Sequence, residues 1–314
     1  MSDDAYCSAA EVFEGWRDDV TSGKPPVFYP IGTGALARLE IGPKLVTLFG
    51  GAPGAGKTAF VMQGVVDALR LAPTLKAVVC NVEMPAEVLL DRQLARLSGV
   101  DLTTVRYRRL GAEHTDRIDQ AMNTLEHVAD RLTFVRPPFT LASAAAAVDA
   151  CGADLLLLDY IQRIPPPGEH GDKRAAVDAT MSYLRQFADA GVAVMVVAAV
   201  GRTKDKQGRS SYDGDGLNLA SFRESSELEF GADDAFILVN GKATDEVVLR
   251  HLKARHTEAR DLTLRFDRAC QRFEVPSHEW NPDGPIATKG KLSAGLRSAW
   301  NRTSAAGDGA EVFP

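Results

Sequence analysis

The octapeptide GAPGAGKT at residues 51–58 constrains the fold of this chain more than any other stretch. It matches the pattern GxxxxGK[ST], follows the apolar run LVTLFG and precedes a segment with helical periodicity. In that context backbone N–H groups surround a phosphate, Lys57 reaches the β- and γ-phosphates, and Thr58 binds Mg²⁺. We therefore expect an ATP-hydrolysing protein with ATP and Mg²⁺ as ligands. The expected nucleotide-binding residues are Gly51, Ala52, Pro53, Gly54, Ala55, Gly56, Lys57, Thr58 and Ala59.

Apolar runs alternate with helical segments through the middle of the chain. Continuous apolar strands separated by helices are typical of a parallel sheet covered on both faces, so we predict an α/β fold. The runs are LVTLFG, AVVCNV, LTFV (132–135), DLLLLDY (154–160), VAVMVVAAV (192–200) and DAFILV (234–239).

The two ends of the chain differ from this central part. After Gly241, EVVLRHLKAR and DLTLRFD alternate polar and apolar residues around HTEA, which predicts a β-hairpin at the sheet edge. The spacing of apolar residues over 9–20 predicts a short amphipathic helix that packs either on its own core or on a neighbouring subunit. We expect an arm at 1–27, an ATPase domain at 28–276 and a flexible tail, rich in Gly, Pro, Ser and Asn, at 277–314.

Composition adds mild constraints. The net charge of -6 and the pI near 5.6 give no general attraction to nucleic acid, so such contacts need a local basic patch. The four cysteines are scattered, which fits reduced thiols and predicts no cysteine metal site. The acidic N-terminal residues include no apolar signal segment, and no run approaches 18 apolar residues, so we expect a cytoplasmic protein without membrane contact.

Two acidic residues follow predicted buried strands. Asp159 ends the leucine run and is the expected second Mg²⁺ ligand, the alternative being an aspartate that caps the next turn. Glu83 ends AVVCNV before Met84-Pro85 and is the candidate general base. Alternatively it only begins the next helix, favoured by the helix dipole, and spacing alone weighs the two interpretations equally.

Cations gather in two other places. Regular alternation along EVVLRHLKAR would present His251, Lys253 and Arg255 on one face, so Lys253 and Arg255 are either a solvated edge or catalytic cations offered to an adjacent subunit. The glycine-rich stretch 201–218 is the most plausible DNA contact, with a solvated loop as the equal alternative. Its cations are Arg202, Lys204, Lys206 and Arg209.

Taken together, these motifs resemble the C-terminal ATPase domain of DnaB-type replicative helicases, a RecA-like family. The similar segments span roughly residues 28–275; they include the loop with Ala59-Phe60, NVEMPAEVLLDRQLARLSGVDLTTVR, LLLLDYIQRI, SFRESSELEFGADDAFILV and LKARHTEARDLTLRFDRACQRFEV. The resemblance implies Glu83 as catalytic base, Asp159 on the metal side, and Lys253 with Arg255 acting in trans. It also implies Gln162 near the DNA-coupling region and Arg223-Glu224 in the interface network.

Two departures bear on function. Family members usually carry Ser-Gln-Leu-Asn-Arg where this chain reads Ala198-Ala199-Val200-Gly201-Arg202, so the glutamine that senses the γ-phosphate is absent. From the length of the sequence we also expect no counterpart of the family's N-terminal, primase-binding domain. We therefore carry three hypotheses: a motor on single-stranded DNA, expected as a hexamer, an ATP-gated assembly switch that does not unwind DNA, and a RecA-like recombination or circadian-type ATPase.

Overall fold

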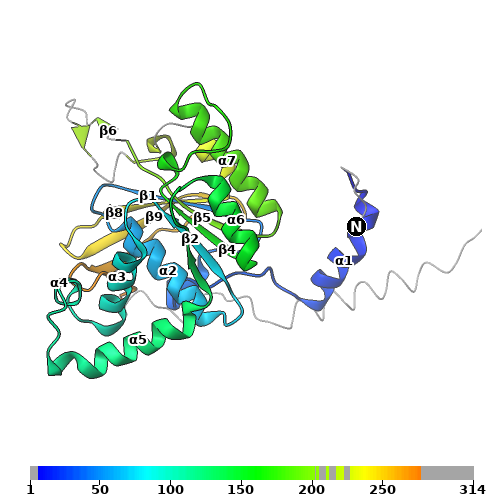
Figure 1. Ribbon diagram of the computed structural model, residues 1–314. Helices are drawn as coiled ribbons and strands as arrows, with labels where there is room; N and C mark the ends of the chain where they lie inside the picture. Colours follow the sequence, from blue (N-terminus) through cyan, green and yellow to red (C-terminus); the bar gives the residue numbers. More distant parts are fainter. Residues whose placement is uncertain (1–5, 202, 205–209, 212–216, 223–226, 277–314) are drawn as a thin grey trace, which may run out of the picture. The chain divides into compact units, whose positions relative to one another are not determined.

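The computed structural model describes residues 6–201, 203–204, 210–211, 217–222 and 227–276. A compact unit begins at Phe28, and the segment that ends at Val27 is a separate unit, so each is described by itself. The larger unit consists of a twisted sheet between two layers of helices (Figure 1).

The sheet is parallel in its centre and antiparallel at one side. Its strand order is β11-β10-β9-β8-β1-β5-β4-β2-β3, and all pairs from β8 to β3 are parallel. This confirms the α/β, RecA-like prediction. The strands are β1 Val46–Gly51, β2 Ala77–Asn81, β3 Leu132–Phe134, β4 Leu155–Asp159, β5 Ala193–Val197, β8 Asp234–Asn240, β9 Glu246–Ala254, β10 Leu262–Asp267 and β11 Arg272–Glu274.

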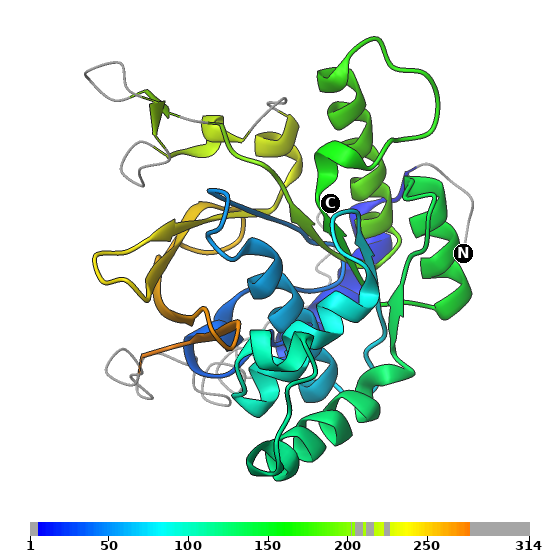
Figure 2. The ribbon, with the colours of Figure 1, turned by 60° about the vertical axis from the view of Figure 1, so that its left-hand side comes forward.

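Helices cover both faces, as continuous burial of the central strands requires. Figures 1 and 2 show α2, α3 and α5 on one side of the sheet and α6 and α7 on the other. The helices are α2 Lys57–Leu71, α3 Ala86–Ser98, α4 Leu102–Arg106, α5 Thr115–Ala129, α6 Leu141–Cys151, α7 Lys173–Asp189 and α8 Glu227–Gly231. Short 3₁₀ turns are η1 Gly34–Arg38, η2 Ala112–His114, η3 Ile161–Arg163 and η5 Leu219–Ser221.

Alternate side chains of the central strands belong to two separate hydrophobic clusters, one on each face of the sheet. On β4, Leu155 and Leu157 pack on the α2 side, whereas Leu156 and Leu158 pack on the α6 and α7 side, and all four are fully buried. Burying apolar area at about 25 cal/mol per Å² makes these two layers the main source of stability. The sheet between these layers holds the carboxyl ends of β1, β2 and β4 at one edge, with β5 between β1 and β4.

The C-terminal strands bear out the predicted hairpin and correct one detail of it. Strands β9 and β10 pair antiparallel, and β11 pairs outside β10, so β11 is the edge strand. A register shift in the β8–β9 pairing places His251 opposite Phe236 but Lys253 opposite Ala235. Such a bulge changes which side of a strand the following residues face. The prediction that His251 shares a face with Lys253 and Arg255 is therefore wrong.

The N-terminal unit contains α1, which spans Ala9–Ser22. Ser8 begins it with a capping box to Glu11, and Gly23 ends it in the left-handed conformation. The rings of Phe13 and Trp16 lie 5.4 Å apart on the helix. The helix predicted for this segment is present, and its packing partner stays a prediction.

Within the described part of the chain, every helix is too short or too polar to cross a lipid bilayer.

Candidate active site

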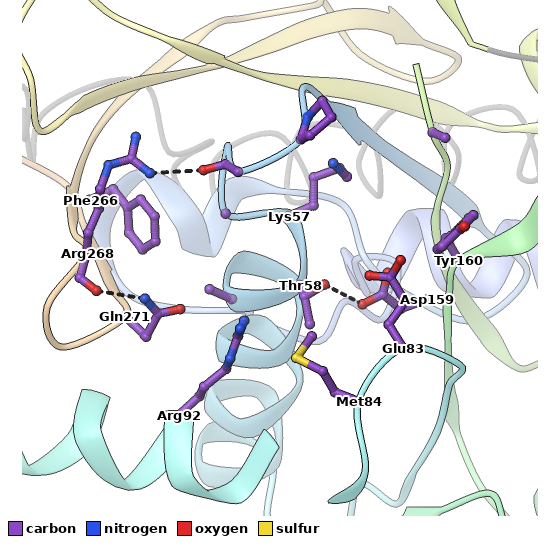
Figure 3. A pocket seen from close by; sticks show the side chains of 15 residues that line it. Lys57, Thr58, Glu83, Met84, Arg92, Asp159, Tyr160, Phe266, Arg268 and Gln271 are labelled. Atoms are coloured by element: carbon purple, nitrogen blue, oxygen red, sulfur yellow. Dashed lines mark hydrogen bonds between the residues drawn. The ribbon is translucent and has the colours of Figure 1, made fainter. Parts of the chain in front are cut away.

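A cleft of about 600 Å³ opens at the carboxyl edge of the parallel strands. The loop after β1, the ends of β2 and β4, and the turn between β10 and β11 all contribute to it (Figure 3). The carboxyl edge is where open α/β sheets bind their ligands. Its lining includes Pro53, Gly54, Gly56, Lys57, Thr58, Ala59, Glu83, Met84, Arg92, Asp159, Tyr160, Ala199, Phe266, Arg268 and Gln271.

The glycine-rich loop has the shape that a phosphate requires. Gly56 precedes α2 with φ +90, a conformation that L side chains rarely adopt, and a Cβ there would lie 2.8 Å from both Phe266 and Phe273. The Lys57 ammonium donates to the carbonyls of Gly51 at 2.9 Å and Ala52 at 3.0 Å. Burial lowers its pKa, whereas the negative charges of Asp159 and Glu83 oppose that change. The cleft thus holds a partly desolvated cation at a helix N-terminus, an arrangement that attracts anions.

Asp159 is the buried carboxylate beside this loop. Its Oδ2 accepts from the Thr58 hydroxyl at 2.6 Å and from the Asn81 amide at 2.8 Å (Figure 3 shows the first bond). Burial raises its pKa to about 6, even though the Thr58 hydrogen bond lowers it. A divalent cation would favour the ionised form, so the Thr58–Asp159 pair fits a Mg²⁺ ligand set.

Glu83 reaches the cleft on a turn that Asn81 fixes. The Asn81 Oδ1 accepts from the backbone N–H groups of Glu83 at 2.9 Å and Met84 at 2.8 Å, while its amide nitrogen holds Asp159. One buried side chain therefore positions both acidic residues. Sequence reasoning did not single out Asn81, although an asparagine at the end of an apolar run was the available signal.

Arg92, on the second turn of α3, supplies a second cation to the cleft. Its Nε is buried and has no hydrogen-bond partner within the described residues. Burial lowers the pKa of its guanidinium, and the charges of Asp159 and Glu83 oppose this. The spacing of nine residues from Glu83 to Arg92 does not identify it from sequence, because helix periodicity alone does not say which face meets the ligand.

The turn between β10 and β11 closes the other side of the cleft. Arg268 donates to the Gly54 carbonyl at 3.0 Å and lies over the Phe266 ring, 4.9 Å from its centroid. Gln271 donates to the Arg268 carbonyl at 2.7 Å. Figure 3 shows both bonds. These residues were missed because more than 200 residues separate them from the loop, and a short polar turn carries no periodic signal.

Lys253 and Arg255 share a face but lie at the opposite end of the sheet from the cleft. Lys253 pairs with Ala235, and Ala235 in turn pairs with Leu48 of β1. Leu48 precedes Gly51 by three residues, so at about 3.3 Å per residue Lys253 lies about 10 Å from Gly51 along the strand direction. Its ammonium donates to the Ala232 carbonyl at 2.7 Å, and burial lowers its pKa. Arg255 pairs with the buried Asp233 at 2.7 Å while its own side chain is 43% exposed.

The predicted DNA loop lies mostly outside the described residues. Arg202, Lys206 and Arg209 are among these undescribed positions, as are Arg223 and Glu224. The backbone of Lys204 belongs to β6 Thr203–Lys204, which pairs antiparallel with β7 Ser210–Ser211.

Comparisons with known proteins show the family and the fold of this chain. The profile of the DnaB-like helicase C-terminal domain matches residues 41–275. The chain belongs to the DnaB-like helicase family. It is accordingly a nucleotide-binding ATPase with a DnaB-like helicase core.

Two solved DnaB-type structures have the same fold. One, described as an ATPase domain, has a TM-score of 0.73 at 15% identity and covers 87% of this chain and 99% of its own. The other is described as a DnaB-like replicative helicase with its interactions with primase. It has a TM-score of 0.72 at 16% identity and covers 87% of this chain and 68% of its own.

The departure from the DnaB-like pattern at Ala199 has a structural counterpart. Ala199 lines the cleft. Its backbone is held by Gln162, whose Oε1 accepts from the Ala199 N–H at 3.1 Å and whose amide nitrogen lies 3.5 Å from the Ala199 carbonyl. The methyl side chain has no hydrogen-bonding atom to offer a phosphate.

Proposed function

We propose that this protein is an ATP-driven motor on single-stranded DNA that works as a ring, most simply a hexamer, of identical copies. In this proposal each nucleotide site combines the cleft of one copy with Lys253 and Arg255 of the next. The position of these two cations, at the end of the sheet away from their own cleft, is the observation that carries the proposal.

Residues of the same copy bind and activate the nucleotide. Lys57 and the loop N–H groups would hold the phosphates, and Thr58 and Asp159 would hold Mg²⁺, which would neutralise phosphate charge. Glu83 orients and deprotonates the attacking water, because Asn81 fixes its backbone beside the cleft. Arg92 supplies positive charge from the α3 side.

Arg255 suits a role in trans because its partner orients it without covering it. Asp233 also accepts from the Val46 N–H at 2.8 Å and from Arg185 at 2.6 Å, so the carboxylate is anchored at the base of β1. A guanidinium that is fixed on one side and 43% exposed can reach a phosphate of a neighbouring copy. Such a cation stabilises the charge on the transferred phosphoryl group and is worth about 10³–10⁵ in rate where it has been measured.

DNA binding is assigned to Arg202, Lys204, Lys206 and Arg209. They cluster in a chain whose net charge is -6, so a local contact with phosphates needs this segment. Residues 1–27 are assigned to subunit assembly and residues 28–276 to the ATPase domain, with 277–314 as a tail.

The decisive experiment mixes two inactive variants. Lys57→Ala removes the phosphate contact, and Arg255→Ala removes the trans cation, so each protein alone should lack ATPase activity. In mixed rings, the intact cleft of an Arg255→Ala copy faces the intact Arg255 of a Lys57→Ala copy, and part of the activity returns. Mixing at a fixed total concentration should give a maximum near equal proportions. Full activity of Arg255→Ala by itself, or no recovery on mixing two folded proteins, contradicts a shared site.

A second candidate function is an ATP-gated assembly switch that does not unwind DNA. The observation that favours it is Ala199, because its methyl group cannot report the γ-phosphate and Gln162 holds its backbone in place. In this version ATP binding drives oligomerisation, and hydrolysis reverses it.

Single-stranded DNA separates the two functions. A motor should show ATP turnover stimulated by DNA, and its DNA affinity should fall steeply as salt rises because several phosphates are contacted. A switch should keep the same basal turnover with and without DNA, while its mass changes between ATP-analogue-bound and nucleotide-free protein.

A further inference from the structure

A second group of cations lies on the turn that follows α4. Residues 102–111 read LTTVRYRRLG and contain three arginines and no acidic residue. We call residues 106–110 the arginine turn. All five of its residues are exposed, and Tyr107 is 61% exposed. None of them lines the nucleotide cleft.

The arginine turn is a fixed part of the fold. Val105, which precedes it, is fully buried in the small hydrophobic cluster that joins α3, α4 and α5. The backbone N–H groups of residues 107–109 all donate to carbonyls within α4, at 2.9–3.0 Å. Arg108 has φ +57, in the left-handed region that residues with a side chain rarely adopt. Such conformations persist where the surrounding structure fixes them, and they are frequent at binding sites.

Two of the three arginines keep their charge uncompensated. Arg108 donates to Asp91 Oδ1 at 2.7 Å, so these two charges cancel. Neither Arg106 nor Arg109 forms an ion pair with any residue that the structure describes. Burial and then the positive charge of Arg106 lower the pKa of Arg92, so a further cation lies behind the turn. In a chain with a net charge of -6, this turn is a local site of attraction for anions.

Tyr107 gives the turn a flat apolar surface beside these cations. The Arg109 guanidinium lies over one face of its ring, 5.3 Å from the centroid. The exposure of Tyr107 leaves room for a second flat group. Unpaired bases stack on aromatic rings and on guanidinium planes, while cations beside the ring contact the phosphates. An acidic peptide would match the charge but would leave the ring without a stacking partner, so the combination favours a nucleic acid.

We propose that the arginine turn binds single-stranded nucleic acid, with Arg106 and Arg109 on neighbouring phosphates and an unpaired base stacked on Tyr107. Arg108 is a positioning residue that ties the turn to Asp91. The site is distinct from the proposed DNA segment at 202–209, since Figures 1 and 2 show α4 beside α3 and away from β6. It does not depend on a nucleotide site shared between copies.

Fluorescence anisotropy with a labelled oligothymidine measures this binding. The starting protein is the full chain with the four basic residues of 202–209 replaced by alanine, so that this segment does not mask the turn. We expect saturable binding whose logarithmic salt slope is about 0.7 for each phosphate contacted. Failure of this protein to bind overturns the proposal for the turn. Failure of DNA to stimulate ATP turnover in the original protein would instead count against the motor.

Alanine variants locate the contacts. Tyr107→Ala should weaken oligothymidine binding by about five- to hundredfold, the range for the loss of one stacked base. Arg106→Ala and Arg109→Ala should each reduce the salt slope by about 0.7. Lys76→Ala is the matched control, because Lys76 is also an exposed cation but lies before the amino end of β2. It should leave both affinity and slope unchanged, and far-UV circular dichroism checks that every variant is folded.

Three further probes identify the ligand. A strand that carries iodouracil should cross-link on irradiation to Tyr107, as read by mass spectrometry of the joined peptide. Oligouridine, titrated beside oligothymidine, shows whether RNA or DNA is the preferred strand. Polyglutamate tests for an acidic peptide, and equal binding of it overturns the proposal. Equal binding of duplex DNA, which has no unpaired base, or unchanged affinity and salt slope in the folded variants of the turn would also overturn it.

Discussion

The contact between the phosphate loop and the β10–β11 region allows a quantitative test at Gly56. Replacing Gly56 by alanine has two costs. The left-handed conformation, at φ +90, costs about 1–2 kcal/mol for an L residue. The new methyl group would lie 2.8 Å from Phe266 and Phe273, which stack on each other at 4.1 Å with nearly parallel rings, and overpacking of this kind costs about 1–3 kcal/mol. We expect Gly56→Ala to lower the free energy of unfolding by about 2–5 kcal/mol.

Gly54 provides the matched control. It also has a positive φ, +78, but a Cβ there meets nothing within 4 Å, so Gly54→Ala should cost only the conformational part. Urea unfolding of nucleotide-free protein, followed by far-UV circular dichroism, measures both variants without their effects on ATP binding. Adding Phe266→Ala should couple favourably with Gly56→Ala by at least about 1 kcal/mol. Equal costs for the two glycine variants, or the absence of coupling, would refute the packing argument.

Two further predictions concern buried carboxylates. The folded pKa of Asp159, about 6, exceeds its usual value of 3.8, so its contribution to stability is complete below about pH 4 and is lost as pH rises through 6. Asp159→Asn should therefore abolish ATP turnover, yet make the nucleotide-free protein up to about 3 kcal/mol more stable at pH 7.5. Urea titrations at pH 7.5 and pH 5 measure this difference. A variant that is less stable than the original protein at pH 7.5 contradicts the prediction. Asp233→Asn should cost about 3–5 kcal/mol, because Val46 N–H, Arg185 and Arg255 lose a charged acceptor, whereas Arg255→Ala should cost under about 1 kcal/mol. Similar losses in thermal and urea unfolding of these two variants would count against the Asp233 anchor.

The parallel sheet could be predicted because its strands carry their own signal. The leucines of β4 and the valines of β5 are buried on both faces, so each strand appears as an unbroken apolar run. The phosphate loop was equally clear, because its glycines and lysine act within eight consecutive residues. Asp159 and Glu83 follow from the same logic, since each ends such a run and emerges in the cleft.

The remaining parts of the site depend on contacts between distant segments. Asn81 matters because it bonds to Asp159, and Arg268 matters because it bonds to Gly54, 214 residues away. The end of an apolar run marks the position of Asn81 but not its partner, and no local pattern marks the bond of Arg268. The bulge in β9 was also missed, because the approximate alternation of polar and apolar residues in EVVLRHLKAR is compatible with a regular strand, and only the pairing with β8 reveals the extra residue.

That bulge makes β9 two independent surfaces in one strand. Residues up to His251 follow one alternation and residues from Lys253 follow the other, so the strand presents His251 on one face and Lys253 with Arg255 on the other. A lineage could alter the chemistry at 251 without disturbing 253 and 255. Loss of the residue at 252 would make the strand regular while His251 stays opposite Phe236 and Lys253 stays opposite Ala235, so both faces would be kept.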